Sequence, residues 1–147
     1  MIVVDASALL AFFLKEEGWD RLAEYMTLTL SVDHVVKEFY NTIWKAVYIR
    51  KTMSVEDAKK VIEIFKKYRE KNMVLEPEDK YIDMALDISI KHGLTVYDSL
   101  YIAQALHNKK PLLTLDDKQR SIAERLGVRV IEIPVSPTHH MSDASTT

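Results

Sequence analysis

Four carboxylates, far apart along the chain, each fall where a strand is expected to end or a helix to begin. Asp5 ends a short β-branched run at the start of the chain, and Asp116 follows a second apolar run. Glu38 and Asp98 lie in the first turns of two predicted helices. In an open α/β sheet, binding sites form beyond the carboxyl ends of the parallel strands. We therefore expect these four acids to gather at one edge of a sheet.

Carboxylates that cluster repel one another and raise one another's pKa unless a cation neutralises them. A set of oxygen ligands without cysteine or histidine suits a hard divalent ion such as Mg²⁺ or Mn²⁺. Such an ion lowers the pKa of a bound water and stabilises charge during displacement at phosphorus, so the pattern indicates metal-assisted phosphodiester hydrolysis. Ser7, Thr114 and Asn41 are candidate supporting groups that orient carboxylates or contact a phosphate, and Asp117 is an additional candidate acid.

Each acid taken alone also has a structural interpretation. Asp5 is a suitable N-cap for the segment that follows it. Asp98 stands three residues after Thr95, which is capping-box spacing, and Asp116 is favoured at a helix start by the helix dipole. Glu38 lies opposite the apolar stripe of its predicted helix, on a face that water can solvate. The coincidence of all four at strand ends and helix starts is what favours a site.

Short apolar runs alternate with helical patterns along the chain. This alternation predicts a single α/β domain with a parallel sheet covered by helices on both faces. Residues 54–92 are expected to form a helical hairpin inserted beside the sheet, with 73–75 as a brief apolar connection. Strands are predicted at 2–5, 28–32, 111–115 and 128–133, and helices at 6–15, 19–26, 33–50, 54–71, 78–92, 97–107 and 117–126.

Composition narrows the class of protein. The chain has 147 residues, of which 48% are hydrophobic and 29% charged, which is typical of one globular domain. A net charge of −2 gives no overall basic field for nucleic acid, although a local basic surface remains compatible with it. No basic residue precedes the apolar start and no segment is long enough to span a bilayer, so a cytoplasmic location without membrane contact is expected. We predict a domain over 1–134 and a disordered polar tail over 135–147.

Four stretches resemble the PIN-domain family, specifically the small VapC-like ribonuclease toxins of type II toxin–antitoxin pairs. They are IVVDASALLAFF, EFYNTIWKA, TVYDSLYIAQAL and PLLTLDDKQRSIAERLGVRVI, in the family's order. The resemblance implies a three-layer sandwich around a parallel sheet of about five strands, and a Mg²⁺- or Mn²⁺-dependent endoribonuclease. It assigns the catalytic acids as Asp5, Glu38, Asp98 and Asp116, with Asp5 and Asp98 most directly on the metal and with Ser7 and Thr114 as the recurring hydroxyls.

The resemblance also implies partners: an RNA substrate, a second copy of the chain in a homodimer, and a VapB-like antitoxin. The antitoxin is expected to lie in a groove near the helical hairpin, lined by apolar positions such as Val61, Ile64, Phe65, Ile82 and Leu86. Tyr97 and Tyr101 are candidates for stacking on a base, or are core residues. Candidate phosphate contacts are Lys15, Lys45, Arg50, Lys51, Lys109, Lys110, Lys118 and Arg120.

Three other interpretations remain open from the sequence. The chain is compatible with a PIN nuclease that processes RNA without an antitoxin. It is also compatible with a non-catalytic PIN module that binds RNA or protein. A phosphotransfer enzyme with Asp5 as nucleophile is less well supported, because Ser7 stands where a haloacid-dehalogenase-like site has its second aspartate.

Overall fold

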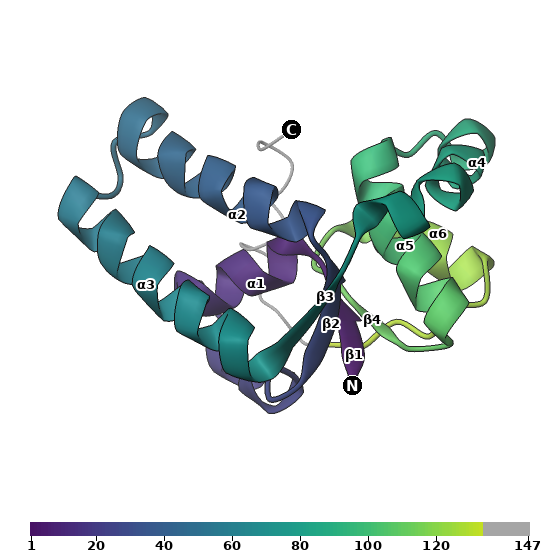
Figure 1. Cartoon of the computed structure of the whole chain (residues 1–147), viewed down its shortest axis with the longest axis horizontal. Helices are drawn as coiled ribbons and strands as arrows, with labels where there is room; N and C mark the ends of the chain where they lie inside the picture. Colours follow the sequence, from purple (N-terminus) through teal and green to yellow (C-terminus); the bar gives the residue numbers. More distant parts are fainter. Residues whose placement is uncertain (134–147) are drawn as a thin grey trace.

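Four parallel strands form the centre of the molecule (Figure 1). The computed structural model describes residues 1–133, so the predicted tail lies outside the described residues. The sheet order is β3-β2-β1-β4, and Val3 in β1 pairs with Leu30 in β2 and Leu112 in β4. Both faces of the central strands are covered, which explains their continuous apolar sequences. The strands are β1 (Ile2–Val4), β2 (Thr29–Val32), β3 (Met73–Glu76) and β4 (Leu112–Leu113).

The strands differ from prediction at two places. The last predicted strand, 128–133, makes only a single parallel bridge in which Val130 pairs with Leu112, and the sheet has four strands rather than about five. The partner strand β4 is only two residues long and offers little backbone for a longer ladder. In contrast, 73–76 is a true edge strand rather than a connection. A run this short cannot be distinguished from a connection by its periodicity.

Helices cover the two faces of the sheet in separate groups, which gives the predicted three-layer arrangement (Figure 1). The segment predicted as a helix over 19–26 is instead two 3₁₀ turns, η1 (Trp19–Arg21) and η2 (Ala23–Tyr25). One group contains α1 (Ala6–Phe13), α2 (His34–Trp44), which continues as the π-turn η3 (Lys45–Ile49), and α3 (Val55–Asn72). The other contains α4 (Ile82–His92), after the 3₁₀ turn η4 (Glu78–Lys80), with α5 (Val96–Asn108) and α6 (Asp117–Arg125).

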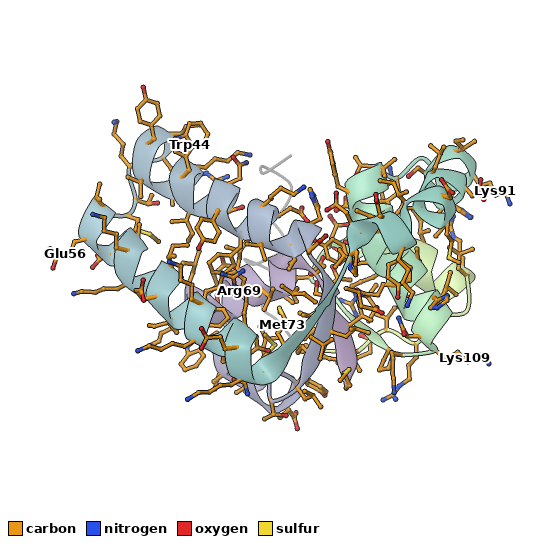
Figure 2. The ribbon with its side chains drawn as sticks, in the orientation of Figure 1. Trp44, Glu56, Arg69, Met73, Lys91 and Lys109 are labelled. Carbon is orange, nitrogen blue, oxygen red and sulfur yellow. The ribbon has the colours of Figure 1, made fainter. Side chains whose placement is uncertain are left out.

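The expected helical hairpin is present, but its arms are α2 and α3 (Figure 1). Its predicted location over 54–92 was wrong, because strand β3 separates α3 from α4 and the two helices lie on different sides of the sheet. The rings of Phe39 and Phe65 stack with centroids 3.9 Å apart and join the two arms near their base. Figure 2 shows Trp44 toward the far end of this hairpin and Lys109 on the other side of the molecule.

Helix α5 is deeply packed against the sheet. Every residue from Ser99 to Ala105 is buried, and the helix packs on β1 and β2. Thr95 caps its start by accepting a hydrogen bond from the Asp98 backbone N–H at 3.2 Å. This cap fixes the first turn of α5 against the carboxyl edge of the sheet. Within residues 1–133, no helix combines the length and the apolar character needed to cross a membrane.

Candidate active site

Asp5 is held at the end of β1 by three hydrogen bonds. Its Oδ1 accepts from Ser7 Oγ at 2.7 Å and from the Ala8 backbone N–H at 3.0 Å, and its Oδ2 accepts from Thr114 Oγ1 at 2.5 Å. The bond to Ala8 makes Asp5 the N-cap of α1, so its capping and site interpretations hold together. Thr114 follows β4, which is next to β1 in the sheet. The parallel pairing of the two strands therefore brings these groups together.

Burial raises the pKa of Asp5 from 3.8 to about 7. The hydrogen bonds from Thr114, Ser7 and Ala8 oppose this rise, because they stabilise the charged form, and the charge of Asp98 adds to it. Asp5 is only 4% exposed, so water contributes little to stabilising its charge. The metal-free site thus holds a carboxyl group that exchanges its proton near neutral pH.

Glu38 lies one turn into α2 and faces the same region. Its Oε1 accepts a short hydrogen bond from the hydroxyl of Tyr101, which is buried in α5. The pKa of Glu38 is raised to about 7: burial is the largest cause and the charges of Asp5 and Asp98 add to it, while the hydrogen bond from Tyr101 opposes it. These charge effects indicate that β1, α2 and α5 bring three of the predicted acids close to one another.

Asp98 and Asp116 complete the acidic group. Burial raises the pKa of Asp98, and the nearby charge of Asp116 raises it further, whereas Lys118 lowers it. The Asp116 side chain accepts from the Gln119 backbone N–H at 2.8 Å and caps α6. The Gln119 side chain in turn donates to the Asp98 backbone carbonyl at 3.2 Å. Asp116 is therefore both a helix cap and a neighbour of Asp98.

Not every predicted group joins this cluster. Ser7 and Thr114 contact Asp5 directly, as expected of orienting hydroxyls. Asn41 is exposed on α2, and none of the hydrogen bonds found within residues 1–133 connects it to the acids. Asp117 is exposed in the first turn of α6, beside Asp116 but outside the buried group. The structure thus supports two of the three supporting groups by contact.

The donor set fits a hard divalent cation. Three partly or fully buried carboxylates within reach of one another's charge, with hydroxyl oxygens beside them, are the ligand chemistry of Mg²⁺ or Mn²⁺. In the part of the chain that is described, no three His, Cys, Asp or Glu side chains already converge closely enough to hold an ion. The carboxylates of Asp5 and Glu38 instead accept bonds from Thr114 and Tyr101.

Three groups near the acids had no predicted role toward them. Tyr101, predicted either to stack on a base or to lie in the core, is a core residue: it is 1% exposed, which excludes stacking on RNA, and its hydroxyl contacts Glu38. Gln119 is fully buried and contacts Thr114 and Asp98. His34 lies with Nε2 3.7 Å from a Glu38 oxygen. The spacing in the sequence indicates part of this arrangement, because Tyr101 follows Asp98 by three residues and Gln119 follows Asp116 by three, which places each pair on one face of a helix.

A second polar network lies at the end of β3. Glu76 accepts hydrogen bonds from Tyr81 at 2.5 Å, from Gln104 at 3.0 Å and from Lys80 at 3.1 Å. Burial alone raises the pKa of Glu76, but these bonds outweigh that effect and lower it to about 2. Gln104 belongs to α5, so the network ties the edge strand to the helix that carries Asp98. It supports the site without joining it.

The sequence of this chain matches a known family of proteins. The PIN domain model matches residues 2–125. The chain belongs to the PIN-domain family. It is 30% identical to ribonuclease VapC3 of Pyrobaculum aerophilum over 128 residues, which cover 84% of this chain and 93% of VapC3. This PIN domain is therefore a homologue of a ribonuclease.

Solved structures show the same fold. PAE2754 from Pyrobaculum aerophilum superposes with a TM-score of 0.67 at 23% identity and covers 99% of this chain and 97% of that one. VapC20 of Mycobacterium tuberculosis, a toxin that cleaves the sarcin–ricin loop, has a TM-score of 0.67 at 14% identity, covering 91% and 100%. FitAcB from Neisseria gonorrhoeae has a TM-score of 0.62 at 14% identity, covering 90% and 97%. At these identities the likeness concerns the fold of the PIN domain.

Proposed function

We propose that this PIN domain is a metal-dependent endoribonuclease that hydrolyses RNA phosphodiester bonds and acts as the toxin of a VapBC-type toxin–antitoxin pair. The observation that carries the proposal is that Asp5, Glu38 and Asp98 come together from β1, α2 and α5, where burial raises the pKa of each and a neighbouring acid raises it further. Carboxylates held together in this way favour a divalent cation. The relation to ribonuclease VapC3 supports RNA as the substrate.

In this proposal Asp5 and Asp98 hold Mg²⁺ or Mn²⁺ most directly, with Glu38 and Asp116 as further acids around it. The bound ion supplies a more acidic water and stabilises the negative charge that develops on the phosphate. Ser7 and Thr114 orient the Asp5 carboxylate through their hydrogen bonds. Tyr101 orients Glu38 from the buried face of α5.

The first test is cleavage of total tRNA and rRNA by the wild type and by Asp98→Asn, in Mg²⁺, in Mn²⁺ and in EDTA. We expect metal-dependent cutting that falls by at least 100-fold in the variant while the fold stays intact, because the amide removes a charged metal ligand. Asp87→Asn, at an exposed acid on α4, is the matched control and should cut like the wild type. Full activity in Asp98→Asn would contradict the assignment. RNA binding without any cutting would favour the non-catalytic PIN module.

The antitoxin part of the proposal rests on the hairpin formed by α2 and α3. A groove of about 620 Å³ runs between them, with Tyr40, Ile43 and Trp44 on one wall and Ala58 and Ile62 on the other. An amphipathic helix from a VapB-like chain would bury its apolar face there. None of the five residues predicted for this groove lines it: Val61 and Ile64 lie on α3 outside its walls, and Ile82 and Leu86 lie on α4, across the sheet. Phe65 is fully buried in the core.

The antitoxin proposal is tested by co-expressing any small chain that is encoded beside this gene. Retention of a VapB-like chain through purification, with loss of ribonuclease activity, is the expected result. Trp44→Asp, which places a charge in the groove wall, should weaken retention while leaving cleavage intact. An active nuclease with no such neighbour would instead favour an RNA-processing role. The predicted homodimer is tested in the same preparation by light scattering during size-exclusion chromatography.

A further inference from the structure

Two aromatic rings stack at the rim of the acidic site. The ring centroids of His34 and Tyr97 are 4.9 Å apart and the rings are tilted by only 11°. His34 is the first residue of α2, one turn before Glu38, and Tyr97 directly precedes Asp98 on α5. Each ring therefore shares a helix turn with one of the proposed catalytic acids.

The two rings differ in how much of their surface meets water. The His34 side chain is 12% exposed and sits between two carboxylates, with Nε2 3.7 Å from Glu38 and Nδ1 3.7 Å from Glu78. Tyr97 is 60% exposed. Because His34 covers one face of the tyrosine ring, the exposed area includes the opposite face. The buried histidine thus supports a ring whose outer face is open to solvent.

We propose that Tyr97, supported by His34, is the stacking platform for one unpaired nucleobase of the RNA substrate next to the cleaved phosphate. The inference rests on the proposed ribonuclease function and specifies how that site holds its substrate. Base stacking on an aromatic ring is the usual way in which proteins grip single-stranded RNA, because every base offers a flat face. A ring already fixed by its neighbour loses little conformational entropy when the base arrives.

Charge beside the platform agrees with this role. Lys118 lies close enough to Asp98 to lower the pKa of that acid, and its Nζ donates to the Gly93 carbonyl at 2.8 Å. Lys37, on the first turns of α2, is largely exposed beside Glu78. Lys37 on α2 and Lys118 on α6 thus place two cations near the stacked rings, where they can contact phosphates of the bound RNA.

The molecule contains a matched control for the stacked pair. Trp44 and Tyr48 also stack, with centroids 5.7 Å apart and a tilt of 12°, and Tyr48 is 66% exposed. This second pair lies at the far end of the α2–α3 hairpin, where Figure 2 labels Trp44. Tyr48→Leu therefore removes an exposed stacked tyrosine without touching the rim of the acidic site.

The test uses single-stranded RNA hexanucleotides that carry the fluorescent base 2-aminopurine at each position in turn, whose emission falls when it stacks. Binding is measured to the full chain in Ca²⁺, and cleavage of the same strands in Mn²⁺. In the wild type we expect strong quenching at one position of the strand. Tyr97→Leu should lose that quenching and bind about tenfold more weakly, with a raised KM and a little-changed kcat. Tyr97→Phe keeps the ring and should restore the quenching that Tyr97→Leu loses, while Tyr48→Leu should behave like the wild type.

A purely structural role for the ring pair makes different predictions. If Tyr97 only clamps α2 to α5, Tyr97→Leu will lose Mn²⁺ affinity in calorimetry in parallel with RNA affinity, and the platform is refuted. Wild-type quenching and affinity in Tyr97→Leu, with the wild type still cutting RNA, would overturn this inference and leave the ribonuclease standing. A wild type that neither binds nor cuts the strands would overturn both.

Discussion

Replacing Asp5 by asparagine should remove part of the pH dependence of stability in the metal-free protein. Asp5 is buried, and its pKa is raised from 3.8 to about 7. The folded state therefore holds the proton more tightly than the unfolded chain does. The stabilisation from this group is complete below pH 3.8 and is lost as the pH rises through about 7. Asparagine resembles the protonated carboxyl group and remains a good N-cap, so the variant should not show this loss.

The magnitude follows from the change in pKa. One pKa unit corresponds to about 1.4 kcal/mol, so the rise from 3.8 to about 7 represents a total loss of about 4 kcal/mol. Linkage between protonation and folding places about 2–3 kcal/mol of this loss between pH 5 and pH 8. The pKa of Glu38 is also raised, from 4.5 to about 7, so its contribution has the same sign and remains in the variant.

The measurement is urea denaturation in EDTA at several values between pH 5 and pH 8, for the wild type, Asp5→Asn and the control Asp87→Asn. Between pH 5 and pH 8, the wild type should lose about 2–3 kcal/mol more of its unfolding free energy than Asp5→Asn does. The control should follow the wild type. Parallel pH curves for the wild type and Asp5→Asn would refute the reasoning, since they would show that Asp5 does not titrate in this window.

Other predictions concern the site and the core. Tyr101→Phe, which removes the hydrogen bond to Glu38, should weaken Mn²⁺ binding by about tenfold or more in calorimetry, and unchanged affinity would exclude a positioning role. Phe65→Ala should lower the unfolding free energy, measured by urea denaturation, by about 3–5 kcal/mol, because this buried ring stacks on Phe39 at the base of the α2–α3 hairpin. Millimolar Mn²⁺ should raise the melting temperature more at pH 8 than at pH 5.5, since protons compete for Asp5 and Glu38; an equal rise would argue against carboxylate ligands.

The sequence predicted the carboxyl edge of the sheet because strand ends and helix starts are marked by local residues. Asp5 follows a β-branched run, and Thr95 and Asp98 mark the first turn of α5. The parallel arrangement then places such residues at one edge whatever the details of packing. For this reason the positions of the acids could be anticipated although the strand count and the 3₁₀ turns could not.

The contacts that tune the acids could not be anticipated in the same way. The hydrogen bond from Tyr101 to Glu38 joins residues 63 positions apart, and a tyrosine inside an apolar helix is usual in a core. The hairpin was misplaced for a related reason. The run 73–76 is too short to be recognised as a strand, so the sequence alone predicts that the helices on either side of it are neighbours. Which helices pair depends on long-range packing, here the stacking of Phe39 on Phe65.

The packing of α5 explains why the acids stay close despite their repulsion. The buried segment from Ser99 to Ala105 is packed on β1 and β2, so Asp98 cannot move away from Asp5 without disturbing the core. Gln104 anchors the same helix to Glu76 at the edge strand. With the backbone held in this way, the repulsion is relieved only by protonation or by a cation. Rigid packing around α5 therefore keeps these charges close together, and we expect a divalent ion to relieve their repulsion near neutral pH.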